Sequence, residues 1–325
     1  MFKVLLAEGL TAEAESRLMA GAEVVRAPAT DEQTLCDHIR DCDALVVRTS
    51  TRVTRTVLEA GRRLRVVGVA GVGTDNVDLA AAEALGIPIL NTPAAASDAV
   101  AEFTVGLILQ LLRPIPRLAD DYRRGRFHAA RAQPHGRELR ELTVGIVGMG
   151  RIGSRVGRIC SAGFGARVLY NDIVEVGPFA FPAERVEKDD LWSRCDIVSL
   201  HVPLTDATRG LVSTDVLKLF RRSAYLINTA RGAVVDTGAL TQALDGGLLA
   251  GAALDVTDPE PLPADHPLLA CPNCILTPHV AARTFGGLAR MCAIVDDVLD
   301  FLAAERPLTP TPASPPGAPV RAGDE

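Results

Sequence analysis

A glycine-rich turn near the middle of the chain constrains the fold more than any other feature. Gly148, Gly150 and Gly153 form the pattern G-x-G-x-x-G between a short apolar run, residues 143–147, and the helical pattern RIGSRVGRICSAG. In such a unit the first glycine permits a tight turn, the second lets the backbone approach a pyrophosphate, and the third lets helix and strand pack closely. The spacing therefore predicts a strand–turn–helix unit that binds a dinucleotide at the helix N-terminus.

An acidic residue after the next apolar run refines this prediction. Asp172 follows Gly153 by nineteen residues, just beyond the run at residues 167–170. A carboxylate at this place accepts a hydrogen bond from a ribose 2′-hydroxyl and repels a 2′-phosphate, so NAD is expected rather than NADP. The alternative for Asp172 is a solvated strand end. The similar string GVGTD at residues 71–75 lacks the third glycine and is not assigned to a dinucleotide.

Short apolar runs alternate with segments of helical length in both halves of the chain, a pattern typical of parallel strands joined by crossover helices. It predicts an α/β protein with two doubly wound parallel sheets. The expected strands are residues 3–6, 23–26, 44–47 and 66–69 in the first series, and 143–147, 167–170, 197–201, 225–228, 251–254 and 275–277 in the second.

Between and after the two series lie segments of different character. Residues 97–112 are nearly wholly apolar and predict a long buried helix. Residues 113–140 are basic and aperiodic, and their prolines are expected to interrupt any helix, as at a domain or subunit boundary. A single helix is expected over residues 284–304, and the Pro-rich residues 307–325 are expected to be disordered.

Composition excludes several classes of protein. The 325 residues are 48% hydrophobic and 23% charged, as in globular proteins. A net charge of −6 and an aromatic share of 4% argue against nucleic acid as a partner. The longest apolar run, residues 105–112, is too short to cross a bilayer, and the N-terminus carries no signal peptide pattern. A soluble, cytoplasmic protein without membrane partners is expected.

The seven cysteines predict neither disulfides nor a metal site. Cys36, Cys42, Cys160, Cys195 and Cys292 lie in periodic apolar segments, as expected for reduced buried thiols. Cys271 and Cys274 form a CxxC, but no second pair of ligands follows at zinc spacing. We therefore expect no bound metal.

Three side chains with catalytic chemistry stand at the ends of predicted strands, where open α/β sheets bind their ligands. Arg231 follows the strand at residues 225–228, Glu260 lies in DVTDPEP, and His279 follows ILTP. A guanidinium holds a carboxylate, an imidazole exchanges a proton near neutral pH, and a neighbouring carboxylate orients the ring. The set predicts hydride transfer to or from a carboxylic acid substrate. The alternatives are a surface Arg, a loop His and a solvated turn acid.

Longer strings extend these signals over most of the chain. VGIVGMGRIG, HVPLTDAT, INTARGAVVD, GAALDVTDPEPLP and TPHVAART occur in this order and resemble the D-isomer-specific 2-hydroxyacid dehydrogenase family, up to about residue 307. The resemblance implies a Rossmann NAD domain inserted into a split, flavodoxin-like substrate domain. The implied boundaries are 1–96 for the first part of the substrate domain, 97–282 for the NAD domain, 283–306 for the closing helix of the substrate domain and 307–325 for the tail.

The resemblance also implies a role for each site residue. Arg231 binds the substrate carboxylate and carbonyl, His279 is the general acid/base, and Glu260 pairs with His279. Asp255 holds the nicotinamide carboxamide. The cofactor, NAD or NADH, is expected to bind Gly148, Gly150, Arg151, Ile152, Gly153, Asp172, His201, Val202, Pro203, Thr208, Thr229, Ala230, Arg231, Asp255, His279 and Thr104. The substrate is expected to bind Arg48, Ala70, Gly71, Val72, Gly73, Arg231, His279 and Arg283.

The identity of the acid stays open. DVTDPEPLPADHPLL is similar to the glyoxylate and hydroxypyruvate reductases, whereas VVRTSTRVT and GVGTDNVDL are more like the 3-phosphoglycerate dehydrogenases. In the latter an Arg at the position of Arg48 reaches the phosphate, usually with a second Arg where this chain has Val69. Arg283 would replace that cation if it points inward, and is a surface charge if it does not. A small 2-oxo acid is the first expectation and phosphohydroxypyruvate the second.

Family members also differ in role and assembly. The co-repressors called C-terminal binding proteins share the fold and the Arg, Glu and His, so an NAD-sensing binding protein is a further alternative. The resemblance implies a homodimer formed through the nucleotide domain. Serine feedback through an additional regulatory domain is not expected, because the sequence ends without one.

Overall fold

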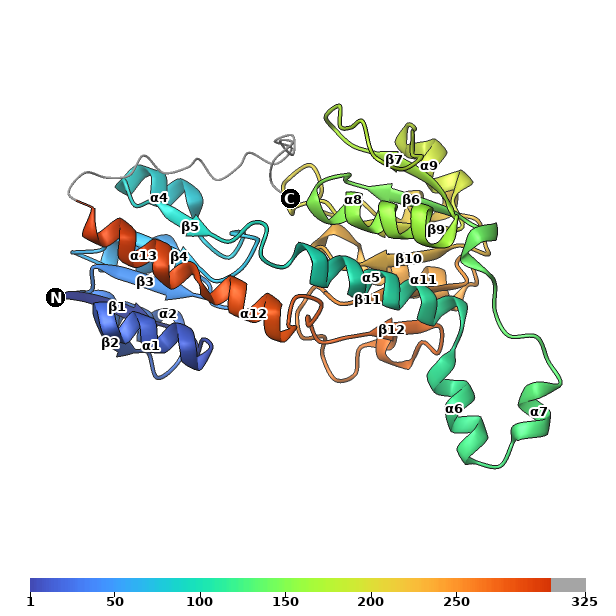
Figure 1. Cartoon of the computed structure of the whole chain (residues 1–325), viewed down its shortest axis with the longest axis horizontal. Helices are drawn as coiled ribbons and strands as arrows, with labels where there is room; N and C mark the ends of the chain where they lie inside the picture. The colour runs from blue at the N-terminus through green and yellow to red at the C-terminus, as the bar shows by residue number, and fades with distance from the viewer. Residues whose placement is uncertain (305–325) are drawn as a thin grey trace. The chain divides into compact units, whose positions relative to one another are not determined.

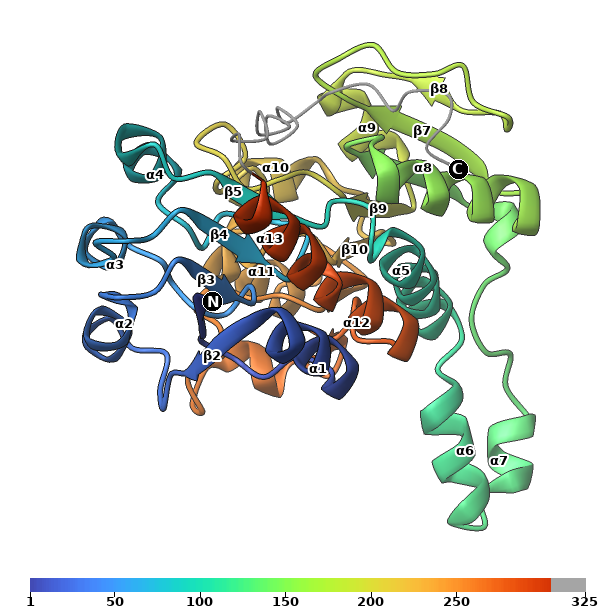
Figure 2. The same cartoon turned by 60° about the vertical axis from the view of Figure 1, so that its left-hand side comes forward.

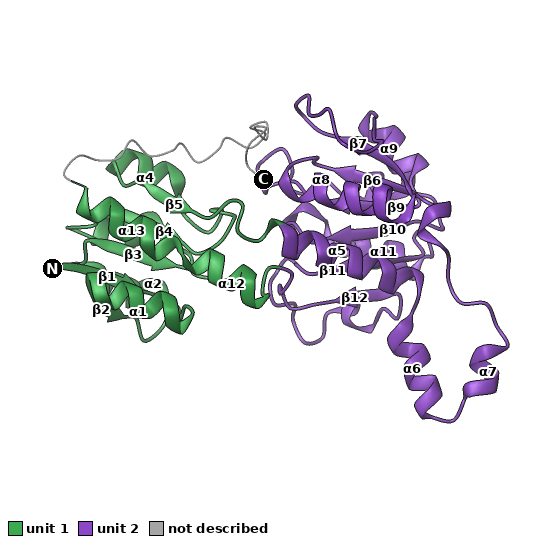
Figure 3. Ribbon diagram, viewed as in Figure 1, with its two compact units in different colours: residues 1–97, 282–318 green, residues 98–281, 319–325 purple. Residues whose placement is uncertain are grey.

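The computed structural model describes residues 1–304, and the tail at 307–325 that we expected to be disordered lies outside the described residues. The described chain divides into two compact units: unit 1 comprises residues 1–97 and 282–304, and unit 2 comprises residues 98–281 (Figure 3). Each unit is built on its own parallel sheet. The predicted α/β fold with two doubly wound sheets is confirmed.

Unit 1 has a five-stranded sheet of order β2-β1-β3-β4-β5 in which all neighbouring strands are parallel. This order is that of flavodoxin-like folds. Its strands are β1 (Phe2–Leu6), β2 (Ala22–Arg26), β3 (Ala44–Val47), β4 (Val66–Val69) and β5 (Ile89–Asn91). Its helices are α1 (Ala12–Gly21), α2 (Glu32–Ile39), α3 (Arg55–Ala60), α4 (Leu79–Leu85), α12 (Phe285–Cys292) and α13 (Ile294–Ala303).

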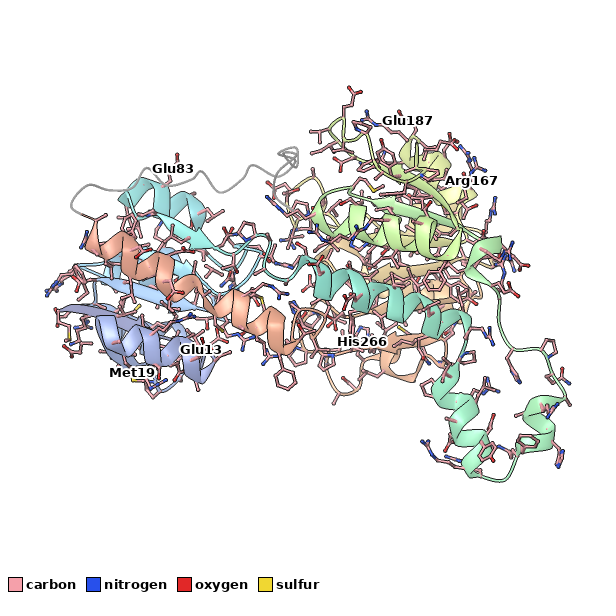
Figure 4. All side chains as sticks on the ribbon, viewed as in Figure 1. Glu13, Met19, Glu83, Arg167, Glu187 and His266 are labelled. Carbon is pink, nitrogen blue, oxygen red and sulfur yellow. The ribbon has the colours of Figure 1, made fainter. Side chains whose placement is uncertain are left out.

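Helices cover both faces of this sheet, as a parallel sheet requires (Figure 2). One core cluster joins buried residues of α2, α3 and α4 to Leu5, Leu45 and Val67. The other joins α1 and α13 to Val4 and Val46. Side chains fill the space between the sheet and the helices, while the labelled Met19 and Glu83 lie on the outer surface (Figure 4).

The helix that closes unit 1 comes from the far end of the chain. α13 packs on β4 so closely that a Cβ at Gly68 would stand 2.5 Å from Val298 Cγ2. The prediction of one helix over residues 284–304 is wrong, because two helices meet at Ala293. Its ψ of −9° ends α12, and the Asp296 amide donates to the Ala293 carbonyl across a tight turn.

Unit 2 has a seven-stranded parallel sheet of order β12-β11-β10-β9-β6-β7-β8, in which the first strand, β6, lies between β9 and β7. This is the Rossmann arrangement, with the reversal of strand order between β6 and β9. Its strands are β6 (Thr143–Val147), β7 (Arg167–Asn171), β8 (Glu184–Arg185), β9 (Ile197–Leu200), β10 (Tyr225–Asn228), β11 (Gly251–Leu254) and β12 (Cys274–Leu276). Its main helices are α5 (Ser97–Leu112), α8 (Arg151–Arg158), α9 (Lys188–Arg194), α10 (Thr214–Leu219) and α11 (Thr237–Asp245).

The predicted helix over residues 97–112 is confirmed as α5, which contributes Val105, Ile108 and Leu112 to a core cluster of unit 2. Beyond it, α6 (Ile115–Arg123) and α7 (Phe127–Arg131) extend from the body of unit 2 as an arm (Figures 1 and 2). The expectation that prolines interrupt any helix here is wrong. Pro114 caps α6 and Pro116 lies in its first turn, where a proline costs no hydrogen bond.

Among residues 1–304 no single helix has the length and apolar character needed to span a membrane; only α5 and α6 taken together, across a 55° bend, meet that measure. The seven cysteines all lie in the described part of the chain, and all are free thiols.

Candidate active site

The glycine turn follows β6, which lies between β9 and β7 in the Rossmann sheet. Gly148 has φ +89°, and a Cβ on it would meet the His201 carbonyl oxygen at 2.6 Å. A Cβ on Gly153 would stand 2.1 Å from the Gly148 carbonyl oxygen, so any side chain there would push the helix off the turn. A Cβ on Gly150 would meet nothing within 4 Å, which leaves its backbone open to a ligand.

The start of α8 beside this turn fits a dinucleotide phosphate. Gly150 is the N-cap residue and supplies no side-chain cap, so the amides at Arg151 and Ile152 have no side-chain acceptor among residues 1–304. Exposed amides and the helix dipole together attract an anion. Arg155, on the next turn, donates from Nη1 to the Arg151 carbonyl oxygen at 2.9 Å and from Nε to Asp98 Oδ1 at 2.5 Å.

Asp172 lies just beyond β7, next to the turn. Its Oδ2 accepts a hydrogen bond from the Met149 amide at 2.7 Å, and its Oδ1 accepts one from the Val174 amide at 3.1 Å. The two amides fix the carboxylate beside the glycine turn while further lone pairs stay available. The neighbouring Ile173 is 78% exposed, a large apolar side chain that our sequence reasoning missed.

The loop after β9 packs against the same turn. His201 Nε2 lies 2.8 Å from Ser199 Oγ, and burial lowers the pKa of His201 to about 3. This imidazole is therefore neutral near pH 7 and is excluded as a proton donor there. Val202 would be 2.9 Å from a Cβ on Gly148, and Thr208 Oγ1 donates to the Pro203 carbonyl oxygen at 2.6 Å.

Two threonines from distant elements meet inside unit 2. Thr104 of α5 is fully buried, and its Oγ1 lies 2.9 Å from Thr229 Oγ1 beyond the end of β10. Because the single Thr104 proton goes to the Val100 carbonyl oxygen at 2.7 Å, Thr229 is the donor in the pair. Thr104 therefore supports the loop that carries Thr229 and Ala230.

The loop after β10 presents Arg231. Asn228 shapes it, because its Oδ1 accepts from the Ala230 amide at 3.0 Å and its Nδ2 donates to the Arg231 carbonyl oxygen at 2.9 Å. Arg231 is half-buried and donates from Nη1 to the Ala230 carbonyl oxygen at 2.7 Å. The role of Asn228 as an organiser was not foreseen from the sequence, although an amide is the side chain that can accept and donate at once.

Asp255 organises the turn that carries His279. Its side chain is 1% exposed. Oδ1 accepts from Thr277 Oγ1 at 2.6 Å and from the Val280 amide at 3.0 Å, and Oδ2 accepts from the Ala281 amide at 2.8 Å. The Asp255 carbonyl oxygen also accepts from the His279 amide at 2.8 Å. The buried Asp255 thus fixes the turn at residues 277–281 through hydrogen bonds.

The structure brings His279 and Glu260 together across nineteen residues of sequence. His279 Nδ1 lies 2.7 Å from Glu260 Oε1, with the two side chains 35% and 44% exposed. Among residues 1–304, His279 is the non-glycine residue with a positive φ, +53°, a conformation the Asp255 bonds support. This orientation leaves Nε2 as the ring atom that faces away from the carboxylate.

The same pair determines the charge of Glu260. Burial alone raises the pKa of Glu260, but the hydrogen bond and charge of His279, the Thr257 amide and the charge of Arg231 outweigh it. The pKa of Glu260 therefore lies below its ordinary value, and the carboxylate is ionised near pH 7.

In unit 1 the predicted substrate residues follow β3 and β4. The loop at residues 70–73 is held by the Val72 carbonyl oxygen, which accepts from Asn91 Nδ2 at 2.7 Å, and by Thr92, whose amide donates to the Gly71 carbonyl oxygen. A Cβ on Gly71 would stand 2.5 Å from Thr49 Cγ2, so only glycine fits. Arg48 is half-buried at the end of β3, and Arg283 is exposed just before α12.

The chain is similar to known dehydrogenases. Residues 105–281 match the model of a family described as D-isomer specific 2-hydroxyacid dehydrogenase, NAD binding domain. A glyoxylate reductase from Aeropyrum pernix is 42% identical over 274 residues, which cover 82% of each chain. A D-3-phosphoglycerate dehydrogenase from Methanocaldococcus jannaschii is 40% identical over 287 residues, 87% of this chain and 54% of that protein, so this chain spans about half the length of that relative.

A solved structure supports the same kinship over nearly the whole length. The NADPH-dependent glyoxylate/hydroxypyruvate reductase from Sinorhizobium meliloti, in complex with NADP and malonate, is 32% identical with a TM-score of 0.86. The likeness covers 97% of this chain and 98% of that one.

Proposed function

The chain belongs to the D-isomer specific 2-hydroxyacid dehydrogenase family, and on that premise we propose that it reduces a small 2-oxo acid such as glyoxylate or hydroxypyruvate, with His279 as the proton donor. It is an oxidoreductase with a nicotinamide cofactor. The observation that carries the assignment of His279 is its 2.7 Å contact with the ionised Glu260.

In this proposal His279 and Glu260 carry out the acid/base chemistry. Glu260 accepts a hydrogen bond from His279 Nδ1, which fixes the orientation of the ring. Nε2 then donates its proton to the carbonyl oxygen of the 2-oxo acid as that oxygen gains negative charge. Because His201 stays neutral, it does not compete for this role.

The guanidinium of Arg231 binds the substrate carboxylate and polarises the carbonyl, both through charge-assisted hydrogen bonds. Asn228 holds its backbone in place. In unit 1 the loop at residues 70–73, stabilised by Asn91 and Thr92, is proposed to bind substrate through its backbone.

The nicotinamide supplies the hydride when the cofactor is bound. The open backbone at Gly150 and the uncapped amides at Arg151 and Ile152 would hold its pyrophosphate, and Asp172 its ribose. The exposed Ile173 would cover the flat face of the adenine. The remaining residues proposed to line the cofactor are Gly148, Gly153, His201, Val202, Pro203, Thr208, Thr229, Ala230 and Asp255, with Thr104 supporting Thr229.

NAD is proposed over NADP because two amides hold the Asp172 carboxylate at the glycine turn. Replacement Asp172→Ser removes the charge that repels a 2′-phosphate. We expect the ratio of kcat/KM for NADH over NADPH to fall about 10- to 100-fold, the size of one charge-assisted contact. An unchanged ratio would contradict the role of Asp172.

A second candidate substrate is 3-phosphohydroxypyruvate. The half-buried position of Arg48 at the end of β3 favours it, because a guanidinium there suits an anion. The kinship with the phosphoglycerate dehydrogenase agrees with this candidate.

The central test follows loss of NADH absorbance with glyoxylate, hydroxypyruvate, 3-phosphohydroxypyruvate and pyruvate. Turnover that Arg231→Ala abolishes, with NADH binding retained, is the expected result. The exposed Arg209 of the same unit is a matched control, and Arg209→Ala should keep the activity. Tight NADH binding without turnover of any acid would overturn the proposed reaction.

We also propose that the chain forms a homodimer through the arm of α6 and α7. No residue of either helix is buried, and Ile115, Tyr122 and Phe127 are 62%, 67% and 40% exposed. Residues 113–137 hold seven arginines and two aspartates, although the whole chain has a net charge of −6. The arm therefore carries both apolar surface and a charge opposite to that of the rest of a second copy.

A hollow of about 250 Å³ on the arm offers a seat for an apolar side chain of the second copy, and its lining is Leu118, Tyr122, Phe127, Ala130, Arg131 and His135. Light scattering of Tyr122→Glu should show a monomer where the parent chain shows a dimer. Replacement of the exposed Met19, on unit 1, by Glu is the control and should leave the dimer intact. A parent chain that is monomeric would contradict the proposal.

A further inference from the structure

Two neighbouring strands of unit 2 end beside the place proposed for the cofactor ribose. β7 is followed by Asp172, and β8 consists of Glu184 and Arg185 alone. The two strands are parallel, and Tyr170 of β7 stands opposite Arg185. Because parallel strands end at the same edge of a sheet, Arg185 lies at the edge that carries Asp172.

The backbone around Arg185 is tied to β7 by two hydrogen bonds. The Val186 amide donates to the Tyr170 carbonyl oxygen at 2.9 Å. The buried Asn171 donates from Nδ2 to the Val186 carbonyl oxygen at 2.8 Å. The sheet therefore fixes the point from which the Arg185 side chain starts.

The guanidinium of Arg185 reaches the residue proposed to bind the ribose. Its Nη2 donates to the Asp172 carbonyl oxygen at 3.1 Å, and the side chain is exposed to solvent. The carbonyl and carboxyl carbons of an aspartate are separated only by Cα and Cβ, so the cation stands close to the Asp172 carboxylate. The bond to the carbonyl oxygen uses one N–H group of the guanidinium and leaves others for a ligand.

Other arginines near this edge strand are paired within the protein. Glu184 accepts from Arg167 Nη2 at 2.7 Å and from Arg194 Nη2 at 3.1 Å. Arg185 has no carboxylate within ion-pair distance among residues 1–304. Its charge at the ribose position is therefore available to an anion.

The chemistry of this position fits a phosphate. NADP differs from NAD by a phosphate on the 2′-oxygen of the adenosine ribose, the oxygen that Asp172 is proposed to bind. In dinucleotide-binding folds an arginine near this oxygen accommodates the phosphate. A guanidinium does so with two parallel charge-assisted hydrogen bonds. Asp172 and Arg185 thus place one repelling and one attracting charge at the same position.

We propose that Arg185 is a further specificity-determining residue, which binds the 2′-phosphate of NADPH and lets the chain use this cofactor as well as NADH. The inference rests on the proposed cofactor site and refines its preference. Asp172 favours NADH, and Arg185 limits how strongly NADPH is excluded. Because Arg185 is proposed to contact the adenosine end of the cofactor, its effect belongs in the KM for the cofactor.

The kinetic test measures kcat/KM for NADH and for NADPH with glyoxylate as the acid. Arg185→Gln removes the charge but keeps an N–H donor for the Asp172 carbonyl oxygen. We expect kcat/KM for NADPH to fall about 10- to 100-fold through KM, while that for NADH stays unchanged. Arg185→Lys keeps the charge without the planar fork and should retain part of the NADPH activity. An unchanged value for NADPH in Arg185→Gln, or an equal loss for both cofactors, would overturn the proposal.

Arg158→Gln is the matched control, because it removes the same charge from the same unit. Arg158 is exposed at the end of α8 that is remote from the glycine turn, and it has no ion-pair partner in the described part of the chain. Both values of kcat/KM should stay as in the parent chain. A loss for NADPH as large as that in Arg185→Gln would trace the effect to net charge and overturn the proposal.

A binding measurement works even without turnover. Calorimetry compares adenosine 2′,5′-bisphosphate with adenosine 5′-monophosphate, which differ only in the 2′-phosphate. Arg185→Gln should weaken binding of the bisphosphate about 10- to 100-fold and leave that of the monophosphate unchanged. Equal weakening of both ligands, or of neither, would overturn the proposal. Failure of the proposed reaction is seen separately, as absence of glyoxylate turnover.

Discussion

The two units carry their charged site residues in opposite ways. In unit 2 the acids and bases are paired within the protein: Glu260 with His279, Asp255 with three donors, and Asp172 with two amides. In unit 1 the cation at the sheet edge, Arg48, has no side-chain partner among the described residues. Catalysis needs side chains that are held in place before the substrate binds. Recognition of a charged ligand can instead use a side chain whose ion-pair partner is the ligand itself.

The largest effect is expected in unit 2, where the charged site residues have partners within the protein. His279→Asn removes the proton donor and should lower kcat about 10²- to 10⁴-fold, the usual contribution of a general acid. NADH affinity, measured by fluorescence titration, should stay near that of the parent chain. If His279→Asn kept more than a tenth of the parent kcat, the pair of His279 and Glu260 would not be the source of the acid/base catalysis, and the contrast between the two units would not hold.

Asp255 tests whether a buried carboxylate positions that donor. In Asp255→Asn one acceptor oxygen becomes a donor that opposes the backbone amides, at a cost of about 1–3 kcal/mol. We expect a lower Tm and a roughly 10-fold lower kcat. Thr277→Val, which removes one donor to the same carboxylate, is the milder control. A variant with normal kcat and only a lower Tm would assign Asp255 to stability alone.

His201 of unit 2 is an imidazole that the folded protein keeps neutral by burial. Its pKa of about 3 in the folded chain lies below the unfolded value, so the unfolded state binds the extra proton between these two values. The corresponding stability is complete above about pH 6.5 and is lost as the pH falls, by roughly 2 kcal/mol at pH 5. Urea unfolding at pH 7 and pH 5 measures this loss.

His201→Gln should reduce the difference in unfolding free energy between the two pH values. Equal differences in the parent chain and the variant would show that another group causes the acid sensitivity.

The smallest effect is expected at Glu260. With its pKa below the ordinary value, this carboxylate is ionised throughout the neutral range, and Glu260→Gln removes its charge from His279. Because both side chains are partly exposed, solvent screens the pair, and we expect kcat to fall only about 3- to 10-fold. An unchanged kcat would mean that Glu260 does not hold the ring of His279 in its working orientation.

Local rules were sufficient for most of the fold. The strand ends and the glycine turn follow from short-range patterns, and β6, β10 and β11 occur at the predicted residues. β5 and β8 were not predicted, because a strand of two or three residues has no periodicity to detect. The helices of the arm were not predicted, because the sequence alone does not distinguish a proline in the first turn of a helix from a proline that interrupts one.

The site residues likewise fall into those that the sequence predicts and those that only the structure reveals. Glu260, His279, Arg231 and Asp172 could be named from residue type and strand ends, and the structure shows that His279 and Glu260 meet. The organising role of Asn228 could not be named, because it depends on which backbone atoms the fold brings within 3 Å.

The division of unit 1 into two stretches has a consequence for the emerging polypeptide. α13 completes the face of the first sheet that includes Gly68 and Val46, yet residues 98–281 are made in between. At ribosomal rates of about 5–20 residues per second, that interval lasts roughly 10 to 40 s. During this time α1 can cover only its own part of that sheet face, and the part that α13 covers in the folded unit stays exposed while the Rossmann unit is made. We therefore expect a chaperone that shields this part to raise the yield of native protein.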